Sequence, residues 1–180
     1  MEELSLHILD LTENSVKAKA SLIEITVIED AAKNILSFEI KDNGCGMSPE
    51  FLSKVTDPFT TTRTTRKVGL GIPLTKLACE QAGGGFEISS KVGEGTRLKA
   101  NFLYDSIDRQ PLGDMKSTLR MMITNHEDTD FIYTHRVNDK EFVLKTAEIK
   151  DILGEVSFSN PDVSNWLKEY IDENIDNLYT

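Results

Sequence analysis

The chain has 180 residues, of which 39% are hydrophobic, so it can form one folded domain or a domain with an appendage. Its formal net charge of -10 argues against a general binder of nucleic acid or of membrane surfaces, because both partners attract clustered positive charge. With two separate cysteines, no signal peptide and no long uncharged apolar run, the sequence is typical of a protein of the reducing cytoplasm, without zinc or a disulfide framework.

The first half of the chain predicts helices and strands in alternation. Apolar residues at helical spacing predict a first helix from Leu4 to about Ala18. The segments LIEITVIE and ILSFEIKD predict strands, and Ser48 before Pro49 predicts the start of a short helix that runs to about Val55.

The segment from residue 57 to residue 68 has almost no apolar side chain and predicts a loop. A helix is expected from Ile72 to Ala82, where three glycines stop it, and FEISSK and RLKANFLY then alternate as strands. The expected fold class is α+β: a two-layer α/β sandwich in which a mixed, largely antiparallel sheet carries helices on one face.

Charge divides the chain near Asp105. Residues 1–104 carry 14 acidic and 12 basic residues, whereas residues 105–180 carry 16 acidic and 8 basic residues. We therefore expect a domain over 1–104 and an acidic extension over 105–180, with a helix, a hairpin of FIYTHRV and EFVLKT, and then helices, the last of which opens at Asn160. The apolar stripes of these helices are expected to pack on the domain or on each other; the alternative is a docking surface for a protein partner.

Asp10 and Asn14 lie four residues apart and so share one face of the first helix. The pair alone is more typical of a solvated helix face. In the functional interpretation, Asn14 offers a neutral oxygen to Mg²⁺, and Asp10 orients or deprotonates an attacking water.

The stretch DNGCGM, from Asp42 to Met47, follows a predicted strand. Its glycines suit a tight turn. They also suit a site where Asp42 accepts a hydrogen bond from an exocyclic amino group, such as that of adenine, while Gly44 and Gly46 let the base lie against the backbone.

The stretch DPFTTTRTTRKVGLGIPL places Arg63, Arg66 and Lys67 before a Gly-Leu-Gly that opens a helix. Each cation alone fits a solvated loop. Together with the backbone amides of a helix N-terminus they predict a polyphosphate site, although neither a P-loop nor a dinucleotide-binding GxGxxG is present.

Five motifs in order, DLTENS, DNGCGM, DPFTTTR, GLGIPLTK and GEGTRLKANF, resemble the GHKL family of ATP-binding domains over roughly residues 4–104. This family includes gyrase B, the ninety-kilodalton heat-shock chaperones, sensor histidine kinases and mismatch-repair ATPases. The resemblance implies the Bergerat fold, with ATP and Mg²⁺ as cofactors. The wording DPFTTTR is closest to the histidine-kinase branch.

The resemblance also implies roles for individual residues. Asn14 matches the magnesium-binding asparagine, Asp42 the adenine-reading aspartate, and Thr96 a residue that helps hold Asp42 and the base through water. Residues 57–68 match the ATP lid. The implied cofactor-binding residues are Asn14, Asp42, Gly44, Gly46, Met47, Thr62, Arg63, Lys67, Gly69, Leu70, Gly71 and Thr96.

The sequence departs from the family pattern at two places. Asp10 stands where the ATPase branch usually has a glutamate as general base. Only 13 residues precede Asn14, whereas a sensor kinase carries its phosphoacceptor histidine far upstream. His7 is expected to pack or bond locally in its helix rather than to accept phosphate, and His126 and His135 carry no motif.

The expected function is that of a histidine-kinase-like ATPase that splits the γ-phosphate of Mg-ATP, with Asp10 as its catalytic residue. The alternatives are a stand-alone kinase that phosphorylates a histidine or serine of a partner, similar to anti-sigma kinases, and a nucleotide sensor without chemistry. ATP is the expected ligand, and a protein partner of the extension is the further expectation.

Overall fold

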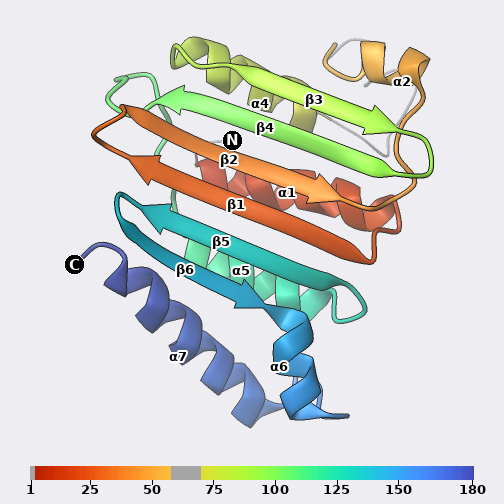
Figure 1. Ribbon diagram of the computed structural model, residues 1–180, viewed down its shortest axis with the longest axis vertical. Helices are drawn as coiled ribbons and strands as arrows, with labels where there is room; N and C mark the ends of the chain where they lie inside the picture. Colours follow the sequence, from red (N-terminus) through yellow and green to blue (C-terminus); the bar gives the residue numbers. More distant parts are fainter. Residues whose placement is uncertain (1–2, 58–69) are drawn as a thin grey trace.

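A computed structural model describes residues 3–57 and 70–180 of the chain. These residues form a six-stranded sheet in the order β3-β4-β2-β1-β5-β6, and Figure 1 shows helices α1, α4 and α5 behind it. The strands are β1 (Leu22–Asp30), β2 (Ile35–Asp42), β3 (Phe86–Lys91), β4 (Gly95–Leu103), β5 (Asp130–Val137) and β6 (Lys140–Lys145). The helices are α1 (Leu4–Lys17), α2 (Pro49–Lys54), α4 (Gly71–Gln81), α5 (Met115–Asn125), α6 (Thr146–Leu153) and α7 (Pro161–Asn177).

The sheet is mixed and largely antiparallel, as the sequence predicts. The predicted hairpin β5–β6 is antiparallel, as are the pairs β1–β2, β3–β4 and β2–β4. Only β1 and β5 run parallel within the described sheet. The predicted α+β class is confirmed. Most of the loop expected over residues 57–68 lies outside the described part of the chain.

The core lies between the sheet and the helices that cover one of its faces. Along β1, buried side chains alternate with partly buried ones, because successive strand residues point to opposite faces. Ile23, Ile25 and Val27 point into the core, where α1 contributes Leu4 and Ile8 from its apolar stripe. Helix α1, which carries Asp10 and Asn14, is thereby fixed against the middle of the sheet.

The N-terminus of α1 is capped by backbone from a distant part of the chain. Glu3 stands at the N-cap without a capping side-chain bond. Instead the N–H groups of Leu4 and Ser5 donate to the carbonyl oxygens of Pro111 and Leu112, at 2.9 and 2.8 Å. Two of the amide donors that a helix start leaves unpaired are satisfied in this way.

The segment after residue 104 continues the sheet. β5 pairs with β1 over eight residues, from Leu22 opposite Asp130 to Glu29 opposite Val137. On α7, Leu167 and Ile171 are fully buried, which accords with packing of its apolar stripe, while Trp166 stays 45% exposed. The division into two units at residues 104 and 105 stays a prediction. None of the described helices is long and apolar enough to cross a membrane.

A buried polar cluster joins the C-terminus to the sheet. His135 is fully buried; its Nε2 lies 2.9 Å from Glu29 Oε2 and its Nδ1 lies 2.8 Å from the hydroxyl of Tyr133. The hydroxyl of Tyr179 donates to the same carboxylate. Burial, reinforced by this hydrogen bond, raises the pKa of Tyr179 above its ordinary value. These groups have a structural role, which the sequence did not indicate.

Candidate functional site

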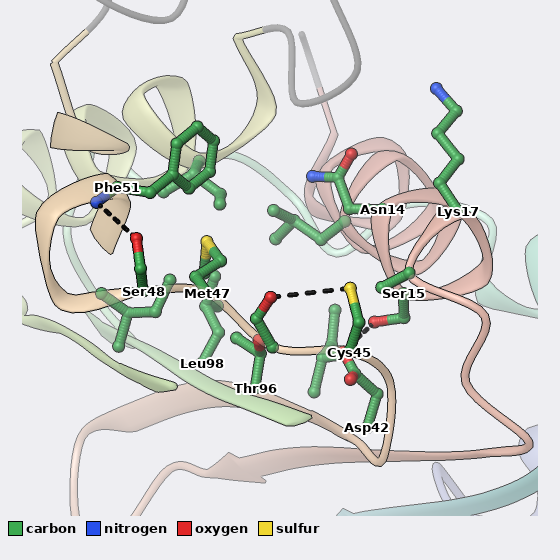
Figure 2. Close-up of a pocket in the computed structure, with 16 residues that line it drawn as sticks. Asn14, Ser15, Lys17, Asp42, Cys45, Met47, Ser48, Phe51, Thr96 and Leu98 are labelled. Carbon is green, nitrogen blue, oxygen red and sulfur yellow. Dashed lines mark hydrogen bonds between the residues drawn. The ribbon is translucent and has the colours of Figure 1, made fainter. Parts of the chain in front are cut away.

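A cavity of about 480 Å³ opens between α1, the segment that follows β2, α2, and the strands β3 and β4 (Figure 2). Its polar lining includes Asn14, Ser15, Lys17, Asp42, Ser48 and Thr96. Its apolar lining includes Leu11, Ile40, Met47, Phe51, Ile72, Ile88 and Leu98. An apolar slot with a few convergent polar groups is the usual form of a small-molecule site.

Asp42 stands at the end of β2 and lines the cavity. Its Oδ2 accepts a hydrogen bond from the buried Ser15 hydroxyl at 2.6 Å, and its Oδ1 accepts one from the Gly44 N–H at 2.8 Å. An ionised carboxylate offers about four acceptor positions, so these two bonds orient the group and leave acceptor capacity for a ligand. Figure 2 shows Ser15 and Asp42 facing each other below the cavity.

The glycines of DNGCGM pack against the protein itself. A Cβ at Gly44 would lie 2.8 Å from the carbonyl oxygen of Ala18, and one at Gly46 would lie 2.1 Å from that of Lys91. Gly46 also has a φ of +71°, which side-chain-bearing residues rarely adopt. Of the two, Gly46 lines the cavity. Close backbone packing therefore explains both glycines, and their contact with a base stays a prediction.

Ser90 connects three parts of the cavity wall. Its Oγ accepts from the Met47 N–H at 2.8 Å, lies 2.8 Å from Thr96 Oγ1, and donates to the Gly95 carbonyl at 3.0 Å. Met47 and Thr96 both line the cavity, and both are among the predicted site residues. The bonds of Ser90 thus join the glycine-containing segment after β2 to the first two residues of β4.

Asn14 projects from α1 over the cavity (Figure 2). Its amide nitrogen is buried and has no hydrogen-bond partner among the described residues. A buried polar atom without a partner costs free energy, so this amide is expected to meet a ligand.

Asp10 lies one turn before Asn14 on α1, but it does not line the cavity. A Cβ at Gly71 would lie 2.0 Å from Asp10 Oδ2, so a glycine is required there for the carboxylate to approach the first residue of α4. Leu70, at the N-cap of α4, is exposed and provides no capping side chain. The Asp10 carboxylate therefore lies at the positive end of the α4 dipole.

The described side chains suit Mg²⁺ better than a metal ion that needs three or more protein ligands. No group of three or more His, Cys, Asp or Glu side chains in the described ranges could hold a metal ion. Mg²⁺ takes oxygen ligands and usually keeps water and phosphate oxygens around one or two protein groups. The side-chain oxygen of Asn14 can supply one such ligand.

Several predicted site residues lie outside the described part of the chain. They are Thr62, Arg63, Arg66, Lys67 and Gly69. The structure therefore brings together Asn14, Asp42, Gly46, Met47 and Thr96 around one cavity, and it places Asp10 beside Gly71.

Four residues at the site were not predicted from the sequence: Ser15, Lys17 and Phe51 line the cavity, and Ser90 bonds to two residues that line it. Ser15 follows Asn14 and lies on the buried stripe of α1, where a serine among apolar residues is a signal for a polar partner. Lys17 is an exposed cation at the cavity, one turn after Asn14. Phe51 belongs to the short helix whose start the sequence predicts at Ser48. The structure confirms this N-cap, because Ser48 Oγ accepts from the Phe51 N–H at 3.2 Å.

His7 packs in the core, as the sequence predicts, but its hydrogen bonds reach other elements rather than its own helix. The side chain is buried, with Nδ1 3.1 Å from Thr75 Oγ1 and Nε2 2.9 Å from Gln110 Oε1. Burial lowers the pKa of His7 from its ordinary value. The imidazole ties α1 to α4 and to the segment before α5.

The two cysteines make it possible to test whether a nucleotide binds in the cavity. Cys45 is exposed and lines the cavity, whereas Cys79 is buried and burial raises the pKa of its thiol to about 12. Because the thiolate is the reactive form, we expect a maleimide to label Cys45 quickly and Cys79 only on unfolding. Saturating Mg-ATP is expected to slow Cys45 labelling at least about tenfold, measured by peptide mass spectrometry, with magnesium alone as control. Equal labelling with and without nucleotide would place ATP elsewhere.

The sequence profile of the family described as histidine kinase-, DNA gyrase B-, and HSP90-like ATPases matches residues 2–105. The chain belongs to this family. The GHKL resemblance seen in the five motifs is thereby confirmed.

Relatives of this chain include a protein of Shewanella frigidimarina described as a sensor protein, which is 33% identical over 103 residues, 56% of this chain and 16% of the relative. The sensor protein SrrB of Staphylococcus aureus is 38% identical over 79 residues, 41% of this chain and 13% of SrrB. The chain thus spans only a small fraction of the length of these relatives.

Two solved structures share the fold. The N-terminal domain of a DNA repair protein matches 81% of this chain and 53% of its own length, with a TM-score of 0.55 and 16% identity. The MutL ATPase domain of Aquifex aeolicus, solved with ADP, matches 85% of this chain and 69% of its own length, with a TM-score of 0.52 and 17% identity. The Bergerat fold expected from the sequence is confirmed.

Proposed function

We propose that the chain binds Mg-ATP in the cavity beside α1 and splits the γ-phosphate. The observation that carries this proposal is the position of Asp42. Its carboxylate stands at the polar end of an apolar slot, with two protein hydrogen bonds made and acceptor positions left. Membership of an ATPase family supports a nucleotide as the ligand.

The base is expected to enter the slot with its amino group toward Asp42. Ile40, Ile88 and Leu98 give the cavity apolar walls, which remove the faces of a planar ring from water. The carboxylate accepts but does not donate, so it favours adenine over a base that presents a carbonyl oxygen at the same position.

The phosphates are expected to lie toward Asn14 and the start of α4. Asn14 would give its side-chain oxygen to Mg²⁺, which would neutralise phosphate charge. Lys17 lies on the same helix face and can attract the polyphosphate, because it is an exposed cation at the cavity. Arg63, Arg66 and Lys67 are the predicted cations of the lid and would offset charge that develops during transfer.

Asp10 is the proposed acid-base residue. It lies one turn from Asn14 and against Gly71, where its carboxylate can accept a proton from a water near the terminal phosphate. We expect Asp10→Asn to lower phosphate release from γ-labelled ATP by about 100-fold or more, because proton transfer by a positioned side chain contributes about 10²–10⁴ in rate.

The same incubation separates the candidate activities when free phosphate and protein-bound label are followed together. ATP affinity, measured by calorimetry in parallel, is expected to change less than about threefold in Asp10→Asn, since Asp10 is not a cavity residue. Unchanged phosphate release in Asp10→Asn would remove this residue from the reaction. Loss of both binding and release would instead assign Asp10 a structural role.

A kinase acting on a separate protein is the second candidate. It is favoured by the similarity to sensor proteins, of which this chain spans only 13–16%. In that case label accumulates on an added partner rather than as free phosphate.

A nucleotide sensor without chemistry is the third candidate. It is favoured by the position of Asp10 beside Gly71 rather than on the cavity lining. In that case ATP binds and neither signal appears.

A protein partner of residues 105–180 remains part of the proposal. Trp166 is 45% exposed and stacks on Tyr170 at a centroid distance of 5.1 Å, which offers a partner an aromatic contact on an acidic helix. A cytoplasmic location is likewise proposed from the cysteine usage and composition of the sequence.

A further inference from the structure

Three polar side chains lie in one row across three neighbouring strands. Asp42 of β2 is paired with Thr96 of β4, and Thr96 is paired in turn with Ser90 of β3. Asp42 and Thr96 line the cavity, while Ser90 is not part of the cavity lining. We expect an effect of Ser90 on a nucleotide in this cavity to act through Thr96, which does line it.

The hydrogen bonds of Ser90 determine which way the Thr96 hydroxyl donates. Ser90 has one hydroxyl proton and two lone pairs. The Gly95 carbonyl can only accept, so it takes that proton at 3.0 Å, while the Met47 N–H occupies one lone pair at 2.8 Å. The contact of 2.8 Å between Ser90 Oγ and Thr96 Oγ1 is then a hydrogen bond only if Thr96 donates.

The Thr96 proton is consequently directed away from the cavity. With its proton engaged by Ser90, the Thr96 oxygen can only accept from a ligand or a water in the cavity. Asp42 is also an acceptor there. The polar end of the cavity thus presents two acceptors side by side.

We propose that Ser90 is a positioning residue for base specificity: by taking the Thr96 proton, it keeps the polar end of the cavity free of donors and selects a base with an exocyclic amino group. This inference rests on the proposed binding of ATP. Ser90 then contributes part of the preference for adenine that would otherwise come from Asp42 alone.

Inosine triphosphate is the probe, because it presents a carbonyl oxygen where adenine has its amino group and an N1–H where adenine has an unprotonated N1. We expect the wild-type chain to bind ATP at least about tenfold more tightly than inosine triphosphate by calorimetry. In Ser90→Ala, Thr96 is free to donate to the carbonyl of inosine. The preference for ATP is then expected to fall about three- to tenfold, as for one hydrogen bond gained by the competitor.

Three further variants separate this effect from general damage to the fold. Ser90→Thr keeps the hydroxyl and is expected to keep the wild-type preference. Ser90→Cys fills the space with a weak hydrogen-bonding group and is expected to behave as Ser90→Ala. Ser89→Ala changes the exposed neighbour on the opposite face of β3 and is expected to leave both affinities unchanged.

The effect of Ser90→Ala must also require the Thr96 hydroxyl. In a Thr96→Val background, Ser90→Ala is expected to leave the ratio of the two affinities unchanged. A wild-type chain that binds neither nucleotide overturns the proposed function and this inference together. A wild-type chain that prefers ATP, with the same preference in Ser90→Ala and Ser90→Cys, overturns the role of Ser90 alone.

Discussion

Replacing Asp42 with asparagine is expected to weaken ATP binding by about 10- to 150-fold. The carboxylate accepts from Ser15 and from the Gly44 N–H, and the proposed adenine amino group adds a third donor to it. Asparagine replaces one of its two oxygens with a donor NH₂ group, which repels the amino group of the base. A hydrogen bond to a charged group contributes about 1.5–3 kcal/mol, which gives this range of affinity.

The measurement is calorimetric titration with Mg-ATP, accompanied by thermal unfolding without nucleotide. The remaining oxygen of asparagine can still accept from Gly44 or Ser15, so the free energy of unfolding is expected to fall by at most about 1–2 kcal/mol. Asp151→Asn, at an exposed carboxylate on α6, is the matched control. If Asp42→Asn binds ATP as tightly as the wild type, the base does not lie against Asp42.

Replacing Asn14 with alanine is expected to abolish the magnesium-dependent part of ATP affinity, a loss of at least about 100-fold with Mg²⁺ present. The physical reason is that the proposed oxygen ligand disappears. The amide nitrogen of Asn14 has no partner among the described residues, so its removal breaks no protein hydrogen bond there. Alanine is also the better helix former, and the unliganded variant is expected to be as stable as the wild type or more stable by about 0.5 kcal/mol.

The test compares ATP titrations with Mg²⁺ and with a chelator. Affinity in the chelator is expected to be similar for the wild type and Asn14→Ala. Asn165→Ala, at an exposed position of α7, provides a control for an asparagine removed from a helix. An Asn14→Ala variant that keeps its response to magnesium would show that other residues hold the ion.

Local patterns account for much of the predicted fold. The 3.6-residue stripe of α1, the strand alternation of β1 and the N-cap at Ser48 are properties of contiguous segments, and the structure confirms each of them. The parallel pairing of β1 with β5 joins segments about a hundred residues apart, and no local pattern specifies which strand becomes a neighbour. The helix α6 directly follows β6, and it packs on the core only through the buried Thr146 and the half-buried Ile149 and Leu153.

Two residues of the candidate site, Asp42 and Asn14, were predicted from sequence motifs. Asp42 and Asn14 stand in motifs whose order the family shares, and the structure places both on one cavity. The alternation of FEISSK places Ser90 on the same face as Phe86 and Ile88, but it does not show which residue Ser90 meets there. The pairing of β3 with β4 is what brings Ser90 opposite Thr96, and this register was not predicted.

The cap on α1 connects the proposed nucleotide site to the segment that follows residue 104. Leu4 and Ser5 depend on carbonyl oxygens near residue 111, and Glu13, directly before Asn14, contacts His126 at 2.7 Å. A change in the acidic extension, such as cleavage or the binding of a ligand, can therefore affect helix α1, which carries Asn14. By thermodynamic reciprocity, a nucleotide that stabilised α1 from the proposed site would change the affinity of the extension for the proposed partner by the same factor.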